Sequence, residues 1–167
     1  MTTVIYGTTG IDKVNNGSIE QADLGPNVAG NGPAFSAYKS ADQTVTSGAP
    51  TLITYDTEDF DTASCFSAGR FTPNVAGYYQ IDTVVGLGAS STTAVLANIR
   101  KNGADYKRIM QLIASTALLN CSGSFLIYMN GSTDYLEIFA TISGTGTCVV
   151  MGTALLSAFS GFLARAA

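Results

Sequence analysis

The side chains that could do chemistry in this chain are carboxylates, because histidine is absent from its 167 residues. Ser-His-Asp triads and Cys-His pairs are therefore excluded, and the commonest zinc and iron ligand is missing. Four acids fall close together, at Asp56, Glu58, Asp59 and Asp61. On a strand, alternation would align Asp59 with Asp61, and their hard oxygens would suit calcium. The segment lacks the spaced Asp/Asn and Gly residues of a dedicated calcium loop, so a solvated acidic loop is the alternative.

A basic cluster holds four of the eight lysines and arginines, at Arg100, Lys101, Lys107 and Arg108. A turn with two solvated strand ends explains this spacing. The alternative is a contact patch at the distal end of the molecule for a glycan or a partner subunit.

Aromatic residues offer a further candidate surface. Five tyrosines at strand spacing could stack on a glycan or could be core and interface aromatics: Tyr78, Tyr79, Tyr106, Tyr128 and Tyr135.

No glycine-rich segment follows a strand and opens a helix, so no phosphate-binding loop is predicted. The sequence thus supplies neither a general base nor a metal set. We expect a protein that is not an enzyme and needs no cofactor.

The composition favours an oligomer. Hydrophobic residues make up 46% of the chain and charged residues 12%, about half the usual charged share. A monomer would expose much neutral or apolar surface, which contacts between identical subunits would bury. The net charge of −4 and the pI near 4.5 give no reason to expect a nucleic-acid or anionic-membrane partner.

The cysteines and the apolar segments bear on the compartment. Cys65, Cys121 and Cys148 are odd in number and irregularly spaced, which predicts buried free thiols in a reducing cytoplasm. The N-terminus lacks the features of a secretory signal. The apolar run from Cys148 to Leu163 is shorter than the roughly 18–20 residues that cross a bilayer, so no membrane insertion is expected.

Residues 1–33 differ from the rest and are predicted to form an extended arm. Ser18 and Gln21 fit a capping box, and Gly25-Pro26 gives a stop, so a short helix is predicted near residues 19–24. The arm carries apolar side chains that could anchor it on another protein: Val4, Ile5, Tyr6, Ile11, Val14, Ile19 and Leu24. The alternative is a loose leader that contributes little.

Residues 34–167 are predicted to be all-β. Short alternating segments recur at Ala34–Tyr38, Thr51–Asp56, Tyr78–Val85, Ala94–Lys101, Tyr106–Ala114, Ser122–Tyr128, Asp134–Thr141, Cys148–Leu155 and Phe159–Ala164. Lys101-Asn102-Gly103 predicts a hairpin, because Asn-Gly tolerates positive φ, and Asn130-Gly131 predicts a second one. Nine or ten strands of this kind suggest a sandwich or jelly roll.

Five segments in order resemble the globular domain of complement-1q-type, tumour-necrosis-factor-like proteins. The signature segment runs from Phe71 through Gly77 and Tyr79, with Ile81 where the family usually has Phe and Thr83 where a further aromatic is usual. The other four are Ala34-Phe35-Ser36-Ala37, Phe60-Asp61, Lys101-Asn102-Gly103 and Phe159-Ser160-Gly161-Phe162-Leu163. The resemblance covers residues 34–164 and implies a ten-stranded jelly roll that forms a homotrimer, with a thinned aromatic stack.

Without a signal peptide or collagen stalk, the chain looks more like the version of this domain in tailed-bacteriophage virion proteins. That resemblance implies a virion protein assembled in the host cytoplasm. The arm would bind other virion proteins, and the jelly roll would face outward as a fibre tip or short tail fibre that contacts a host-surface glycan or protein. A capsid decoration or head-fibre protein of the same fold is one alternative. A free bacterial lectin-like module is another.

Overall fold

A computed structural model describes residues 23–26, 30–113 and 116–167. Its strands are β1 (Ala34–Tyr38), β2 (Gln43–Val45), β3 (Thr51–Leu52), β4 (Thr57–Asp61), β5 (Phe66–Ser67), β6 (Arg70–Phe71), β7 (Ala76–Lys101), β8 (Ala104–Leu112), β9 (Thr116–Asn130), β10 (Leu136–Thr145), β11 (Cys148–Val150) and β12 (Ser157–Ala166). The all-β prediction is confirmed. Within the described ranges, no helix has the length and apolar character needed to cross a membrane.

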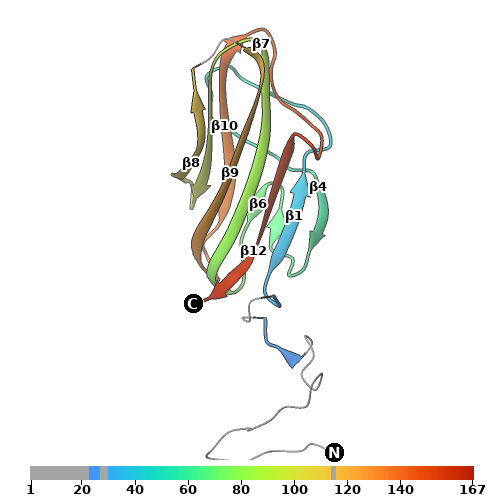
Figure 1. Cartoon of the computed structure of the whole chain (residues 1–167), viewed down its shortest axis with the longest axis vertical. Helices are drawn as coiled ribbons and strands as arrows, with labels where there is room; N and C mark the ends of the chain where they lie inside the picture. The colour runs from blue at the N-terminus through green and yellow to red at the C-terminus, as the bar shows by residue number, and fades with distance from the viewer. Residues whose placement is uncertain (1–22, 27–29, 114–115) are drawn as a thin grey trace, which may run out of the picture.

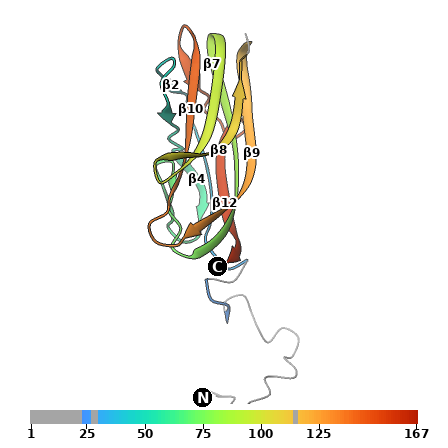
Figure 2. The ribbon, with the colours of Figure 1, turned by 90° about the vertical axis from the view of Figure 1, so that its left-hand side faces the viewer.

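The strands form two layers that share β7 (Figure 1). The first layer has the order β4-β1-β12-β7-β9, with antiparallel pairing throughout. The second layer joins β8 to β7, β10 and β6, with β3 also on β10. Figure 2 shows β9 on one side of this sandwich and β10 on the other.

Both layers can include β7 because this strand is 26 residues long, much longer than the strands predicted from the sequence. Tyr78–Val85 and Ala94–Lys101 were predicted as separate strands, but both belong to one element. Its first half pairs with β9 and β12, its second half with β10 and β8, and the β9 pairing jumps between Gly88 and Thr92. Small residues at the jump let the strand bend from one layer into the other. The bend lies at the end of the sandwich opposite the C-terminus (Figure 1).

The two Asn-Gly predictions had different outcomes. Asn102 and Gly103 have φ of 54° and 81° and join β7 to β8, so the first hairpin is confirmed. Asn130-Gly131 does not form a hairpin, because β9 pairs with the first half of β7 and β10 with the second half. The prediction was wrong because local turn chemistry cannot show that the next strand joins the other layer.

Other boundaries also differ from the prediction. The described residues form twelve strands rather than nine or ten. The predicted strand Thr51–Asp56 keeps only Thr51–Leu52, and that at Cys148–Leu155 keeps only Cys148–Val150. The regular pairing with β10, and with β2 and β7, ends at these residues. The next residue of each segment still donates its backbone N–H, Ile53 to the Ile138 carbonyl and Met151 to the Gly86 carbonyl.

Aromatic side chains fill the space between the layers. The ring of Phe35 lies 4.4 Å from that of Phe71, 4.8 Å from that of Phe66 and 4.9 Å from that of Phe159, between centroids. Thr83, at the position where the resembled family usually has an aromatic residue, is buried. Its hydroxyl lies 3.4 Å from that of Tyr55. Tyr55 thus finds a polar partner inside an apolar core. Burial raises the pKa of Tyr55 above its ordinary value.

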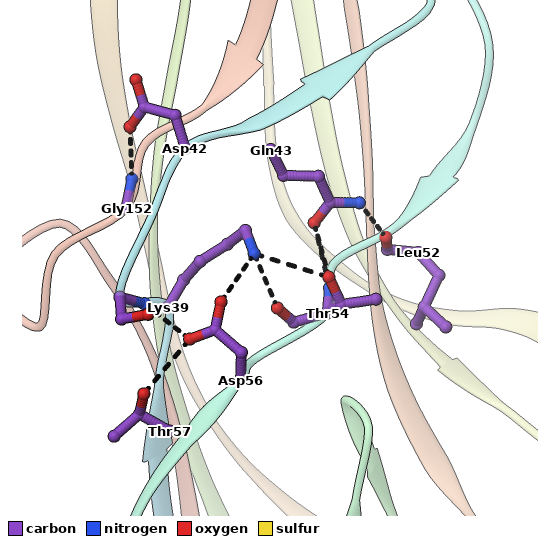
Figure 3. A network of polar contacts seen from close by, with 9 residues as sticks. Lys39, Asp42, Gln43, Leu52, Thr54, Asp56, Thr57 and Gly152 are labelled. Atoms are coloured by element: carbon purple, nitrogen blue, oxygen red, sulfur yellow. Dashed lines mark hydrogen bonds and ion pairs between the residues drawn. The ribbon is translucent and has the colours of Figure 1, made fainter.

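A polar network joins the end of β1 to the segment that leads into β4 (Figure 3). The Lys39 ammonium is buried and donates to the Thr54 carbonyl at 2.9 Å and to Asp56 Oδ2 at 3.2 Å. Asp56 Oδ1 accepts the Ser40 backbone N–H at 2.7 Å. Nearby, the amide of Gln43 bridges the Leu52 carbonyl and the Thr54 backbone N–H.

The arm is described only in part. Val4, Ile5, Tyr6, Ile11, Val14 and Ile19 lie outside the described residues, as does most of the predicted helix near residues 19–24. Leu24 is described and exposed. At the end of the arm, Gly32 packs against Leu163, and the Pro33 carbonyl accepts the Leu163 N–H at 3.0 Å. Residues 30–33 thus join the sandwich at the same end as the C-terminus (Figure 1).

The three cysteines lie among the described residues. All three thiols are free and buried, which confirms that part of the prediction. Burial raises the pKa of Cys121 to about 11.

Candidate functional site: an exposed sheet face

The outer face of the first layer exposes large apolar side chains. Five of them lie away from the bend of β7 and are between 41% and 58% exposed: Phe60 on β4, Tyr78 on β7, Leu126 and Tyr128 on β9, and Phe162 on β12. Leu118, opposite Gly88 near the bend, is a sixth, 44% exposed. Scattered exposed hydrophobic residues are normal, but a group on one face marks an interaction site. We call these five residues the association face.

The strand register brings these residues together from distant parts of the sequence. Tyr78 lies opposite Tyr128, with ring centroids 5.4 Å apart. In the next row, Gln80 lies between Leu126 on β9 and Phe162 on β12. Directly paired residues point to the same side of a sheet, so these rows share one face.

The middle of the same layer is hollow. Its hollow has a volume of about 430 Å³ and is lined by Asp82, Thr83, Val84, Ser122, Gly123, Ser124, Ala158 and Ser160. Asp82 lies between Ser160 on β12 and Ser124 on β9. The Gln80 amide donates to Asp82 Oδ1 at 3.2 Å and to Ser124 Oγ at 2.7 Å. Small side chains create the hollow, and the association face lies beside it.

The acidic cluster does not converge on an ion. Thr57–Asp61 is the edge strand β4, so the prediction of a loop was wrong for these residues, which pair with β1. Asp59 accepts the Ser36 hydroxyl at 2.8 Å, and Asp61 accepts the backbone N–H groups of Ala63 and Phe66. Across the described parts of the chain, no three His, Cys, Asp or Glu side chains are grouped to hold a metal.

Asp56, another acid of the cluster, forms an ion pair with Lys39. Burial alone would raise the pKa of Asp56. The hydrogen bonds from Ser40 and the Lys39 ammonium outweigh that effect and lower the pKa to about 2.

The basic cluster is divided among separate partners. Arg100 Nε lies 2.6 Å from Asp105 Oδ1, and its guanidinium lies 3.9 Å from the Phe139 ring centroid. Arg108 Nη1 donates to Gln111 Oε1 at 2.7 Å. Lys107 Nζ is 5.2 Å from the ring centroid of Tyr106.

Lys101 is tied to the loop that follows β9. Its Nζ lies 2.8 Å from Asp134 Oδ2 and donates to the Tyr128 carbonyl at 2.6 Å. Burial would raise the pKa of Asp134, but hydrogen bonds from Asn102, Lys101 and Asn130 and the Lys101 charge lower it. This lysine therefore has a structural partner.

A row of alternating charges crosses the outer face of the second layer. Arg70, Glu137, Arg100 and Asp105 lie opposite one another on β6, β10, β7 and β8. Arg70 Nη2 is 2.7 Å from Glu137 Oε1, and its guanidinium lies 4.0 Å from the Tyr135 ring centroid. Sequence reasoning missed the Arg70–Glu137 pair, because 67 residues separate its members.

The tyrosines are likewise distributed. Tyr79 is a fully buried core residue, whereas Tyr78 and Tyr128 belong to the association face. Tyr135 lies beside Arg70, and Tyr106 is exposed on β8. They do not form one stacking surface.

The same arrangement of layers is found in several solved structures. The globular domain of zebrafish complement 1qA superposes with a TM-score of 0.59 at 17% identity, covering 81% of this chain and 99% of that one. Murine APRIL gives 0.58 at 10% identity, covering 78% and 98%. The Eiger TNF of S. frugiperda gives 0.59 at 14% identity, covering 80% and 93%.

The chain has a complement-1q/tumour-necrosis-factor-like fold. No family model matches the sequence, and no curated protein matches it either. The comparisons therefore establish the jelly-roll architecture alone. Within that architecture, the association face gathers five exposed large apolar side chains on one layer.

Proposed function

We propose that this chain is a homotrimeric structural protein of a bacteriophage virion. The proposal assigns it no catalytic role. Its jelly roll faces outward as a fibre tip or short tail fibre, and residues 1–33 anchor it to other virion proteins.

The association face carries the proposal of a trimer. Aromatic and leucine side chains on four strands of the first layer are half exposed in the single chain, and contact with identical copies would remove them from water. Fully burying an exposed large apolar side chain is worth about 1.5–3 kcal/mol, so completing the burial of each half-exposed one would contribute about 1 kcal/mol. The low charge content of the chain agrees with this use of the surface.

The positions of the chain ends support the proposed orientation. Residues 30–33 and the C-terminus share one end of the sandwich, and the bend of β7 lies at the other (Figure 1). Anchoring through the arm would leave the bend and its neighbouring loops facing outward. The virion assignment itself rests on the resemblance to phage proteins.

Light scattering, measured as the protein elutes from a size-exclusion column, tests the trimer. We expect a mass of about three times 17.3 kDa at micromolar concentration. Phe162→Glu should give a folded monomer, because a charge replaces a half-exposed aromatic side chain in the association face. Ser67→Glu, an exposed substitution on β5 in the second layer, should remain trimeric. A monomeric wild-type chain would contradict the proposal.

Immunogold labelling of purified particles tests the location. Label on the tail supports the fibre assignment, and label on the head supports the decoration assignment. Absence of label from intact and disrupted particles, together with a glycan-array signal for the free protein, would favour the lectin-like alternative.

A further inference from the structure

A small cavity opens on the second layer, on the side of the sandwich away from the association face. It has a volume of about 390 Å³ and is lined by Leu52, Ser67, Ala68, Arg70 and Glu137. Small-molecule sites have volumes of about 300 to 1,000 Å³, so a compact ligand fits. The cavity lies at one end of the row of alternating charges, because Ser67 is paired with Arg70 and Arg70 with Glu137.

The surrounding strands hold the walls of this cavity in place. A tight turn joins β5 to β6, with Ala68 and Gly69 at φ values of 50° and 87°. A Cβ on Gly69 would lie 2.4 Å from the Ile53 carbonyl oxygen, so the turn packs closely on the segment that follows β3. On the other wall, the Gln43 amide donates to the Leu52 carbonyl at 2.8 Å (Figure 3). Little ordering is therefore needed when a ligand binds.

Arg70 and Glu137 form an ion pair that leaves hydrogen-bonding groups unused. Arg70 Nε and Nη2 both donate to Oε1 of Glu137, at 2.9 Å and 2.7 Å. An arginine fork frequently uses both oxygens of a carboxylate instead. Within the described residues, Glu137 Oε2, Arg70 Nη1 and the Ser67 hydroxyl have no hydrogen-bond partner. The Glu137 side chain is only 7% exposed, so its second oxygen is an acceptor with little access to water.

We infer that this cavity binds a neutral sugar, whose hydroxyl groups use these three unpaired positions. One sugar hydroxyl donates to Glu137 Oε2 and accepts from Arg70 Nη1, and a neighbouring hydroxyl exchanges a hydrogen bond with Ser67. The apolar side chain of Leu52 provides contact for the C–H groups of the sugar ring. A few polar groups beside an apolar wall thus give the ligand one orientation.

The charges of the row favour a neutral ligand over an acidic one. Arg70 and Arg100 bring two positive charges and Glu137 and Asp105 two negative charges, so the row has no net charge to attract an ion. An acidic sugar would also bring its carboxylate beside the buried acid Glu137. The Arg70 guanidinium covers one face of the Tyr135 ring, so recognition depends on hydrogen bonds more than on stacking.

The site belongs to the single chain and does not require the proposed trimer. It lies on the layer opposite the association face, so assembly through that face would leave the cavity open. Its use in host attachment, by contrast, rests on the proposed function, to which it adds the ligand class of a neutral glycan.

Nuclear magnetic resonance titration of the isotope-labelled full-length chain tests the inference. The probes are the methyl glycosides of glucose, galactose and mannose, each beside the methyl glycoside of the corresponding uronic acid. We expect at least one neutral glycoside to bind, and to bind more tightly than its acidic counterpart. The amide shifts should concentrate in the β5–β6 turn and at the start of β10, where the cavity lies.

Two substitutions in the cavity measure its contribution to the dissociation constant. Ser67→Ala removes an exposed hydroxyl and should weaken binding about three- to tenfold, the effect of one neutral hydrogen bond. Glu137→Gln keeps an oxygen for Arg70 but puts an amide N–H in place of the free acceptor, so binding should weaken by about tenfold or more. Ser90→Ala, at an exposed serine on the bend of β7, is the matched control and should bind as the wild type does. Circular dichroism checks folding, and Ser67→Ala suffices if Glu137→Gln does not fold.

The possible outcomes separate this inference from the proposed trimer. Failure of the wild type to bind any neutral glycoside would overturn the inference. Binding that is unchanged in both cavity variants, or that shifts amides elsewhere, would overturn it as well. A preference for the uronic acids would do the same, since Arg70 would then be an anion site. Each of these results leaves the trimer standing, whereas a monomer that binds the sugar in this cavity would overturn the trimer alone.

Discussion

Lys39 and Asp56 form an ion pair whose two members differ greatly in their access to water (Figure 3). The side chain of Lys39 is 6% exposed and that of Asp56 is 39% exposed. The Lys39 ammonium has two further acceptors, the Thr54 carbonyl at 2.9 Å and, at 3.5 Å, the Thr54 hydroxyl. Removing the anion should therefore cost more than removing the cation.

The expected magnitudes follow from what each substitution leaves behind. Breaking a fully buried pair costs about 3–5 kcal/mol. Asp56→Asn leaves a buried ammonium but retains an oxygen acceptor near water, so we expect a loss of about 2 kcal/mol. Lys39→Met leaves a carboxylate that water can reach and that still accepts the Ser40 N–H. Its cost should be about 1 kcal/mol, mainly from the bond lost at Thr54.

Urea unfolding at pH 7, followed by circular dichroism at one fixed chain concentration, measures these losses. The double substitution should cost about as much as Lys39→Met alone, since no buried charge is then left unpaired. The resulting coupling between Lys39 and Asp56 would be about 2 kcal/mol. A Lys39→Met loss equal to or larger than that of Asp56→Asn would refute the reasoning, as would additive losses.

The same pair gives a pH dependence with a definite sign. Because the pKa of Asp56 is lowered to about 2 from 3.8, the stability that it contributes is fully present above about pH 4. It is lost as the pH falls through 2. The difference in unfolding free energy between wild type and Asp56→Asn should therefore shrink between pH 4 and pH 2. A difference that grew in this window would contradict the assigned direction.

Four further predictions concern other parts of the fold. Ala68 has a φ of 50° in the β5–β6 turn, so Ala68→Asn should raise the free energy of unfolding by about 0.5–1 kcal/mol. Gly69→Ala should lower it, because the added Cβ would lie 2.4 Å from the Ile53 carbonyl oxygen, and urea unfolding measures both. Asp134→Ala should cost about 2 kcal/mol at pH 7 and less in acid, because the lowered pKa of Asp134 makes its contribution fade as pH falls. Cys121, whose pKa is raised to about 11 by burial, should resist a thiol reagent at pH 8 until the chain is unfolded.

Much of the β-structure could be predicted from local pattern. Alternation identified β1 at its observed bounds, and Asn102-Gly103 identified the β7–β8 turn from φ preferences alone. The path of β7 could not be predicted in this way, because small residues at its bend match a loop as well as a strand. Asn130-Gly131 failed for a related reason, since its two flanking strands pair with different halves of β7.

The polar contacts were harder to predict than the strands. Arg100 and Lys101 are neighbours in the sequence, yet they pair with Asp105 and Asp134 respectively. Successive residues on a strand point to opposite sides, so a run of like charges rarely forms one patch. The acids from Asp56 to Asp61 also have separate partners: Asp59 accepts from Ser36 on β1, whereas Asp61 accepts from Ala63 and Phe66, which follow it in the chain.

The association face shows which information the sequence lacked. On β7, alternation separates buried Tyr79 from Gln80 and Asp82, which indicates a polar outer side. Tyr78 shares that outer side, but one exposed tyrosine carries no information by itself. Its meaning comes from Tyr128, fifty positions away, which the register places directly opposite. The association face therefore follows from which strands pair and in which register, and a two-residue period alone cannot supply either.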